Sequence, residues 1–189
     1  HVFLESGLKY LLDQNDQDTV SILEAGFGTG LNFLLTATYC GQNKISLRYT
    51  GIEAYPLSPD LIRQCAHQQF VNDEIWDSFI SNYDESFRQE VSFDPFIRLE
   101  LIQQKLSGFN SNRLFDILYF DAFAAAKQPE MWTLQSLCHI CHFLRPGGLF
   151  VTYAMNGSLK RNMEALGFRP EKVPGASGKR EMLRATLKG

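Results

Sequence analysis

The chain has 189 residues, of which 44% are apolar, 21% charged and 13% aromatic, and its formal net charge is −3. This length is typical of one domain, and the apolar share is enough for a sizeable core. The composition excludes an intrinsically disordered chain. No apolar run approaches the roughly 20 residues of a membrane span, and four cysteines are too few for a disulfide scaffold. We therefore expect a soluble globular domain, and because the chain begins at His1 we expect a native segment before it.

The charge is segregated along the chain. Residues 1–159 carry 10 lysines and arginines against 18 acidic residues, whereas residues 160–189 carry eight against three. A basic segment can attract a polyanion even when the whole protein is acidic. A solvated basic tail has the same composition, so both interpretations stay open.

Short apolar runs alternate with longer helical patterns, which predicts a doubly wound, mainly parallel α/β sheet. Strands are predicted at Val20–Leu23, Leu47–Glu53, Phe96–Ile102, Ile117–Phe120, Leu149–Tyr153, Phe168–Val173 and Met182–Thr186. Helices are predicted from Leu31, from Pro59 with Ser58 as N-cap, over Thr133–Leu144, and over Ser158–Leu166 with Gly167 as C-cap. Residues 71–95 are acidic and aromatic-rich, and we expect a helical insertion there within one domain that spans residues 1–189.

A glycine-rich turn, Glu24-Ala25-Gly26-Phe27-Gly28-Thr29-Gly30, follows the first predicted strand. Glycines let a backbone turn sharply and approach a ligand closely, and the amides of the next helix face that ligand. A dinucleotide fingerprint needs a glycine where this chain has Leu31 or Phe33, and a P-loop needs a Gly-Lys-Ser/Thr that is absent. The turn instead resembles the acidic-x-Gly-x-Gly-x-Gly pattern of class I S-adenosylmethionine-dependent methyltransferases. That resemblance places the Glu24 carboxylate near the cationic end of the cofactor.

The resemblance implies roles for two further carboxylates. Glu53 ends the second predicted strand, where an acidic residue is expected to accept hydrogen bonds from both ribose hydroxyls. Asp121 directly follows the buried run Ile117–Phe120 and is expected to face the reactive centre. A carboxylate there can hold an amine by charge-assisted hydrogen bonds, orient its lone pair and take its proton. The alternative is that Asp121 only caps the turn that follows.

Longer stretches of the chain resemble the bacterial tRNA 5-methylaminomethyl-2-thiouridine methyltransferases. They are Ala25–Leu34, Phe120–Trp132 and Gly178–Leu183, joined by the shorter stretches His1–Glu5 and Glu53–Leu57. The resemblance covers nearly the whole chain. It implies a Rossmann-like class I methyltransferase fold, with a mainly parallel seven-stranded sheet, helices on both faces and an antiparallel C-terminal strand. The chain resembles the transferase part alone, because it lacks the length and the second glycine fingerprint of the family's FAD-dependent oxidoreductase.

The reaction of that family converts 5-aminomethyl(-2-thio)uridine at the tRNA wobble position to 5-methylaminomethyl(-2-thio)uridine. The resemblance therefore implies S-adenosyl-L-methionine as cofactor and tRNA as partner, in the cytoplasm. A further expected partner is the enzyme that supplies the aminomethyl intermediate. Neither a membrane nor a metal is expected.

The family motifs assign the site residue by residue. Asp121 is expected to be catalytic. Cofactor contacts are expected from Glu24, Gly26, Phe27, Gly28, Thr29, Gly30, Asn32, Glu53, Ala54, Gln103, Asp121 and Phe123. Substrate contacts are expected from Lys127, Met131, Trp132, Lys179, Arg180 and Glu181, and further phosphate contacts from Lys160, Arg161, Arg184 and Lys188. For Trp132, stacking on an anticodon base and a place in the core are equally compatible with the sequence.

The chain departs from the family pattern at three places. Ala122 and Ala125 stand where the family usually has glycine and proline. Gln103-Gln104-Lys105 stands where the family usually has Gly-Asp after the third strand. That aspartate commonly serves the adenine amino group, so we expect a glutamine side chain to recognise adenine here.

Two alternative functions remain open from the sequence. One is a methyl- or aminopropyltransferase that acts on a small amine, and the other is a non-catalytic S-adenosylmethionine-binding module. Cys138–His142 matches the C-x-x-C-H pattern of c-type haem attachment, and Cys65 with His67 could extend it to a zinc site. We interpret these residues as half-buried helical side chains, not as metal or haem ligands.

Overall fold

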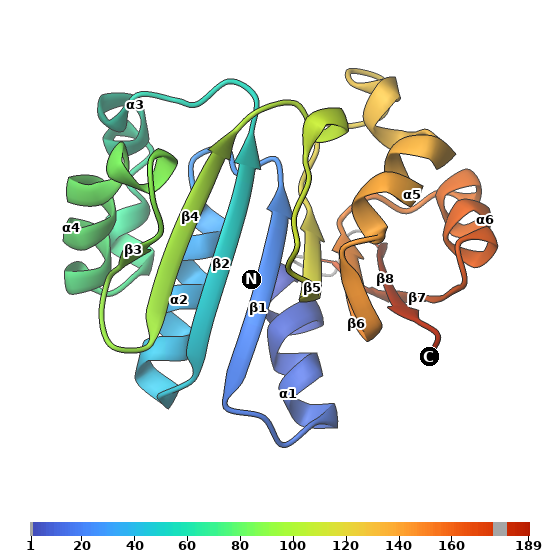
Figure 1. Cartoon of the computed structure of the whole chain (residues 1–189), viewed down its shortest axis with the longest axis horizontal. Helices are drawn as coiled ribbons and strands as arrows, with labels where there is room; N and C mark the ends of the chain where they lie inside the picture. Colours follow the sequence, from blue (N-terminus) through green and yellow to red (C-terminus); the bar gives the residue numbers. More distant parts are fainter. Residues whose placement is uncertain (1, 176–180) are drawn as a thin grey trace.

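The computed structural model describes residues 2–175 and 181–189. In these residues eight strands form one sheet, in the order β3-β4-β2-β1-β5-β6-β8-β7 (Figure 1). The strands are β1 (Thr19–Ala25), β2 (Ser46–Glu53), β3 (Val91–Ser92), β4 (Ile97–Gln103), β5 (Phe115–Phe120), β6 (Leu144–Thr152), β7 (Phe168–Pro174) and β8 (Glu181–Leu187). β1, β2, β4, β5 and β6 pair in parallel, whereas β8 runs antiparallel to both of its neighbours. The predicted α/β fold with an antiparallel C-terminal strand is confirmed.

The sheet has one strand more than the seven predicted. The additional strand, β3, pairs antiparallel with β4 at the edge of the sheet. It lies within residues 71–95, so that segment is not purely helical. Two residues are too short a run to carry an alternating pattern, and therefore the sequence offered no signal for this strand.

Helices cover both faces of the sheet (Figure 1). They are α1 (Tyr10–Gln14), α2 (Leu31–Asn43), α3 (Pro59–Gln64), α4 (Asp73–Asn82), α5 (Leu134–Cys141) and α6 (Gly157–Ala165). Short helical segments are η1 (Leu4–Lys9), η2 (His67–Phe70), η3 (Glu85–Phe87), η4 (Leu106–Gly108) and η5 (Pro129–Trp132). Side chains of η1, α1, α2, α3 and α4 pack on one face, and those of η4, α5 and α6 pack on the other. None of the helices in the described part of the chain is long and apolar enough to cross a membrane.

Capping residues predicted from the sequence mark the start of α3 and the end of α6, where Gly167 has a φ of +87°. Ser58 accepts a hydrogen bond from the Leu61 amide, with Pro59 at the first helical position, as predicted. The predicted end of α5 at Leu144 is wrong, because α5 stops at Cys141. β6 begins at Leu144 and runs through the Pro-Gly-Gly sequence, which forms an irregularity inside the strand rather than a turn before it. Gly147 permits this, since its φ of +80° lies in the left-handed region.

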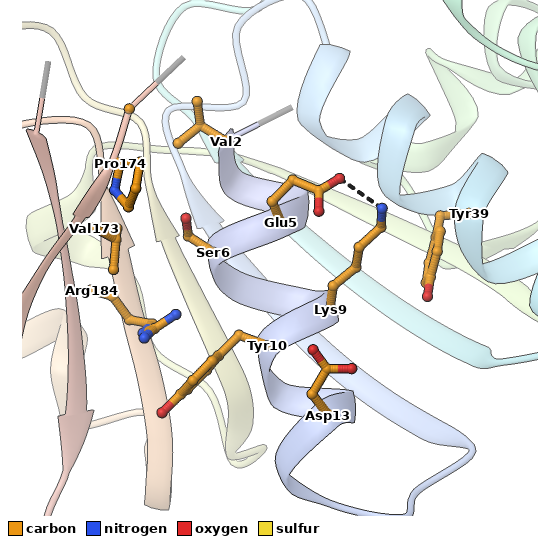
Figure 2. A pocket seen from close by; sticks show the side chains of 11 residues that line it. Val2, Glu5, Ser6, Lys9, Tyr10, Asp13, Tyr39, Val173, Pro174 and Arg184 are labelled. Atoms are coloured by element: carbon orange, nitrogen blue, oxygen red, sulfur yellow. Dashed lines mark hydrogen bonds and ion pairs between the residues drawn. The ribbon is translucent and has the colours of Figure 1, made fainter. Parts of the chain in front are cut away.

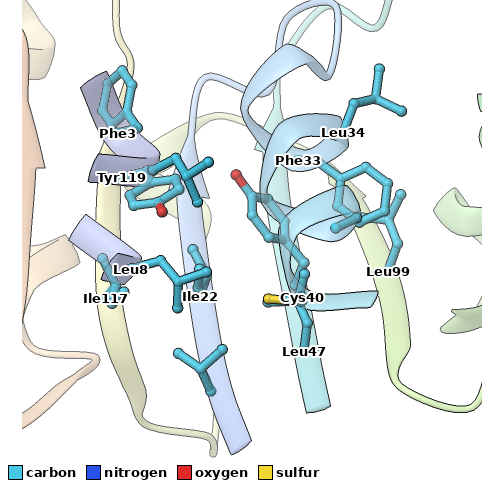
Figure 3. Packing of buried hydrophobic residues seen from close by; sticks show 14 of the residues in the cluster. Phe3, Leu8, Ile22, Phe33, Leu34, Cys40, Leu47, Leu99, Ile117 and Tyr119 are labelled. Atoms are coloured by element: carbon cyan, nitrogen blue, oxygen red, sulfur yellow. The ribbon is translucent and has the colours of Figure 1, made fainter. Parts of the chain in front are cut away.

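The first helical segment, η1 with α1, was not predicted from the sequence. Its apolar residues Phe3, Leu4, Leu8 and Leu11 lie on one face and enter the core against the sheet. Figure 3 shows Phe3 and Leu8 packed beside Ile117 and Tyr119 of β5. The spacing of these residues is helical over residues 2–14, so the sequence does carry a signal for this segment.

Phe27, inside the glycine-rich turn, anchors that turn to the core. Its ring is 3% exposed and contacts Phe33 and Phe79, with centroid separations of 6.3 and 6.2 Å. The ring lies over Gly51 of β2, where an added Cβ would come within 2.5 Å of a Phe27 ring carbon and 2.8 Å of Leu101. The absence of a side chain at Gly51 therefore makes the space that Phe27 occupies.

We expect Gly51→Ala to lower the free energy of unfolding by about 1–3 kcal/mol, because the new methyl group overpacks a filled core. The matched control is Gly108→Ala, where an added Cβ would meet only the Gln104 Oε1 atom, at 3.8 Å. The control is expected to change stability by less than about 1 kcal/mol. Urea denaturation of both variants tests this, and equal midpoints would contradict it.

Candidate active site

The carboxyl ends of the parallel strands meet at one edge of the sheet. β2 and β4 lie on one side of β1 in the sheet, and β5 and β6, which come later in the chain, lie on its other side, so the strand order reverses at β1. Ligands in open α/β sheets bind at this kind of switch point, just beyond the strand ends. The structure brings the turn at residues 26–30, Glu53, Gln103 and Asp121 to this edge.

The glycines of the turn have positive φ angles, which explains their positions in the sequence. Gly26 has φ +87°, and a Cβ there would come within 2.7 Å of the Asp121 carbonyl oxygen. A hydrogen bond also holds these two segments together, because the Asp121 amide donates to the Ala25 carbonyl at 2.9 Å. Gly28, with φ +55°, has no atom within 4 Å of the place where its Cβ would stand. The turn is therefore packed at Gly26 and open at Gly28.

Glu53 is held between the turn and the end of β2. Its carboxylate accepts from the Gly28 amide at 2.9 Å and from the Tyr55 amide at 3.0 Å. These contacts leave a lone pair on each oxygen for a further donor, such as a hydroxyl group. Gln103 of β4 is paired with Glu53 and is exposed, and Ala54 follows Glu53 at the same edge. This half of the site fits the ribose and base of an adenosine.

A single amide bridges the two carboxylates on the other half of the site. Asn32, in the first turn of α2, donates from Nδ2 to Glu24 Oε1 at 2.6 Å and to Asp121 Oδ2 at 2.7 Å. Glu24 is fully buried and also accepts from the Tyr49 hydroxyl at 2.8 Å. Because Nδ2 carries two hydrogens, these bonds use its whole donor capacity. Asp121 is therefore fixed by a side chain from the first helix as well as by its own strand.

Burial and charge distinguish the two carboxyl groups. Burial raises the pKa of Glu24 well above its usual range, and the nearby Asp121 charge raises it further. Burial also raises the pKa of Asp121, but hydrogen bonds from Asn32 and Tyr153 oppose that rise. When two close carboxyl groups compete, the more deeply buried one keeps the proton. Hydrogen bonds from Asn32 and Tyr49 oppose the rise at Glu24, as those from Asn32 and Tyr153 do at Asp121. Burial is the largest cause for both groups, so we expect the fully buried Glu24 to keep a proton more readily than the partly buried Asp121.

Other residues of the turn have supporting positions. Thr29 Oγ1 lies 2.8 Å from Nε2 of His67, so η2 is tied to the turn. Burial lowers the pKa of His67, which favours its neutral form. The Phe27 side chain lies in the core, so only its backbone faces the edge where the cofactor is expected.

Residues expected on the substrate side are spread over the segment that follows β5. Phe123 is 65% exposed, and Lys127 is exposed nearby in sequence. The Trp132 indole N–H donates to the Phe123 carbonyl at 2.8 Å, and its ring meets Phe120 edge-on at 5.0 Å. Trp132 and the partly buried Met131 pack against the core. Of the two interpretations for Trp132, this contact favours the core.

The basic C-terminal residues make contacts within the fold where the structure describes them. Glu181 pairs with Lys172 at 2.7 Å. The Arg184 guanidinium lies 3.3 Å from the Tyr10 ring centroid and pairs with Glu171 at 2.8 Å. Lys179 and Arg180 lie outside the described residues. Lys160 and Arg161 are exposed on α6.

A separate groove of about 750 Å³ runs along the first helical segment. Figure 2 shows the exposed face of η1 and α1, with the Glu5–Lys9 ion pair, between Arg184 at the β7–β8 end of the sheet and Tyr39 of α2. The lining of the groove contains no residue of the glycine-rich turn, nor Glu53 or Asp121. It is not part of the site at the carboxyl edge.

The cysteine motif lies on α5, where Cys141 is buried and Cys138 is exposed, and both are free thiols. Within residues 2–175 and 181–189, no group of three or more histidine, cysteine or acidic side chains is arranged to hold a metal ion.

Three contacts of the site were missed by sequence reasoning. Tyr49, His67 and Tyr153 bind Glu24, Thr29 and the Asp121 segment respectively. Tyr153 ends a predicted strand, so its place at the carboxyl edge was readable from the sequence. The other two have no local signal, because their partners lie 25 and 38 residues away.

The fold and the site together define a nucleoside-cofactor-dependent α/β enzyme of the methyltransferase type. Residues 71–188, more than half of the chain, match the sequence model of a family described as S-adenosyl-L-methionine-dependent methyltransferase. The chain therefore belongs to that family, and S-adenosyl-L-methionine is its cofactor. The open turn at Gly28 and the Glu53 carboxylate fit this group.

Known proteins extend the comparison. The tRNA 5-methylaminomethyl-2-thiouridine biosynthesis bifunctional protein MnmC of Pseudomonas savastanoi pv. phaseolicola is 32% identical over 99% of this chain and 30% of its own length. Its namesake from Nitrosospira multiformis is 31% identical over 100% of this chain and 32% of its own length. The chain thus spans about a third of these relatives.

Solved structures agree in fold. MNMC2 from Aquifex aeolicus has a TM-score of 0.75 at 21% identity, covering 100% of this chain and 59% of that one. The N-methyltransferase NodS from Bradyrhizobium japonicum has a TM-score of 0.58 at 14% identity, covering 99% and 93%. The predicted methyltransferase fold is confirmed.

We expect the buried proton on Glu24 to make stability depend on pH. Above the ordinary carboxyl pKa of 4.5 the unfolded chain releases a proton that the folded chain keeps, so the free energy of unfolding falls as pH rises. The slope is about 1.4 kcal/mol per pH unit for one full proton. Glu24→Gln removes this contribution, so its stability should fall less than that of the wild type between pH 5 and 8.

Urea denaturation across this pH range measures the difference. The exposed Glu130 of η5 provides the matched control, and Glu130→Gln should follow the wild-type slope. A Glu24→Gln protein with the same pH slope as the wild type would show that Glu24 is ionised in the folded state.

Proposed function

We propose that this chain transfers a methyl group to the primary amine of 5-aminomethyl(-2-thio)uridine at the tRNA wobble position. The observation that carries the proposal is the Asp121 carboxylate, held beside the cofactor turn by Asn32 at 2.7 Å. The methyltransferase family and the names of the relatives that cover the chain support it. We further propose that residues 1–189 act as one domain, in the cytoplasm, on an intermediate supplied by another enzyme.

In the proposed reaction Asp121 binds and orients the amine. S-adenosylmethionine, when bound, supplies a methyl group on a positively charged sulfur. The chain has to align the nitrogen with that methyl group and to exclude water. A carboxylate attracts the ammonium form of the substrate, and it can accept the proton that the nitrogen must lose. Asn32 and Glu24 hold Asp121 in place for this role.

Exposed aromatic side chains at the carboxyl edge favour a nucleic acid substrate over a small amine. Tyr55 follows β2, Phe70 ends η2, Phe123 follows β5 and Tyr153 follows β6. Their exposed fractions are 72%, 63%, 65% and 43%. Large apolar groups that stay exposed around a site commonly mark a binding surface. Unpaired bases of single-stranded RNA stack on such rings. Exposed cations in segments that follow strands β4, β5 and β6 can pair with the phosphates of such an RNA. They are Lys105, Lys127, Lys160 and Arg161.

Calorimetry with S-adenosylmethionine, followed by methyl transfer to tRNA from cells that lack this activity, tests the proposal. We expect cofactor binding and the appearance of 5-methylaminomethyl(-2-thio)uridine in the tRNA. Cofactor binding with transfer to free amines but not to tRNA would favour the small-amine alternative. Binding without turnover on any amine would favour the non-catalytic module.

We expect Asp121→Ala and Asp121→Asn each to lower kcat at least about 100-fold, because general-base and orienting contacts typically contribute that much. Asparagine preserves the shape but neither attracts a cation nor accepts its proton. Steady-state kinetics at saturating cofactor measures the effect, and calorimetry checks that the cofactor still binds. Rates close to wild type in both variants would remove Asp121 from the mechanism.

A further inference from the structure

Tyr153 lies immediately after β6, next to the catalytic segment. β5 and β6 run parallel with Tyr119 opposite Val151, so two more residues along each strand bring Asp121 abreast of Tyr153. The ring is 43% exposed and therefore reaches the open side of the carboxyl edge. An edge-on contact with the ring of Phe3, at a centroid distance of 6.2 Å, supports it from below.

The hydroxyl of Tyr153 lies between two oxygen acceptors. It donates to the Ala122 carbonyl oxygen at 2.8 Å, and it is also within hydrogen-bond reach of the Asp121 carboxylate. A phenol has one proton and two acceptor lone pairs. Whichever of the two oxygens takes the proton, the Tyr153 oxygen keeps lone pairs that can accept a hydrogen bond from a donor beside Asp121.

The chemistry of amine methylation needs such a second acceptor. A neutral primary amine has two N–H bonds and one lone pair, and the lone pair has to point at the methyl group. One acceptor leaves the nitrogen free to rotate about its hydrogen bond. Two acceptors at fixed positions form hydrogen bonds with both N–H groups and leave a single direction for the lone pair. Such positioning lowers the free-energy barrier to methyl transfer.

We propose that Tyr153 is a second amine-binding residue. Its phenolic oxygen accepts a hydrogen bond from one N–H group of the attacking amine, while Asp121 accepts a hydrogen bond from the other N–H group. The proposal rests on the methyl transfer to a primary amine proposed above. In the transfer a nitrogen–carbon bond forms as the sulfur–carbon bond breaks, and the electron pair of the broken bond stays on sulfur. The nitrogen gains a positive charge and then loses one proton, to Asp121 or to water.

This arrangement also explains a single methylation. The product is a secondary amine, and in its neutral form it has only one N–H bond. It cannot satisfy both Asp121 and Tyr153 while its lone pair points at a second methyl group. The two acceptors therefore select primary amines and reject the methylated product.

The test compares wild type, Tyr153→Phe and a matched control, Tyr39→Phe. Tyr39 lies on α2 beside Lys9 and lines the separate groove along the first helical segment, which contains no residue of the glycine-rich turn. Phenylalanine keeps the ring of residue 153 and removes only the hydroxyl. The substrates are tRNA with the primary 5-aminomethyl group and the same tRNA with the secondary 5-methylaminomethyl group. The readouts are kcat, KM, the products by nucleoside mass spectrometry, and cofactor affinity by calorimetry.

We expect Tyr153→Phe to lower kcat on the primary amine about tenfold, the effect of one hydrogen bond to a charged or reacting group. Its preference for the primary over the secondary amine should fall by a similar factor, while cofactor affinity and the Tyr39→Phe kinetics match the wild type. Unchanged kcat and preference would overturn the proposal. A loss of rate that is equal for both amines would also overturn it, because it would show a merely structural role. A wild-type protein without methyl transfer to tRNA would instead overturn the proposed function.

Discussion

The bridge from Asn32 to Glu24 and Asp121 is the interaction on which the site depends. It connects the end of β1, the start of α2 and the end of β5 through one side-chain amide. The amide uses both of its hydrogens, so neither carboxyl group can move without leaving a buried donor unsatisfied, which is costly. This contact converts three separate chain segments into one rigid unit at the carboxyl edge.

The two acidic residues joined by the bridge differ in burial and in the effects that act on their pKa values. Burial and the neighbouring Asp121 charge raise the pKa of Glu24, and hydrogen bonds from Asn32 and Tyr49 oppose that rise, so Glu24 is the group expected to protonate first as pH falls. Burial also raises the pKa of Asp121, but hydrogen bonds from Asn32 and Tyr153 oppose that rise, and its side chain is only partly buried. Environment rather than residue type thus distinguishes the two carboxyl groups, as the role proposed for Asp121 requires.

Packing beneath the turn explains why the site can be both open and fixed. Phe27 fills the space above Gly51 and holds the turn from below, while Gly28 leaves open space above it. Along the first helical segment, Arg184 of β8 is used inside the fold, stacked on Tyr10 and paired with Glu171. Because Glu171 belongs to the same C-terminal segment, this pair leaves the net charge of the segment unchanged, and the fold decides only which of its cations have an acidic partner.

The amino-acid sequence by itself determined the alternation of strands and helices, the glycine-rich turn, and the carboxylates at the ends of β1, β2 and β5. These features are local, since they depend on apolar periodicity and on glycines that permit positive φ angles. The tertiary structure alone decided that Asn32 joins Glu24 to Asp121, that Trp132 supports Phe123, and that Tyr153 stands abreast of Asp121. Such contacts join residues 8 to 89 positions apart and depend on strand order and register. Local pattern leaves the order of the strands open, and it specifies register only weakly in strands such as β5 whose two faces are both apolar.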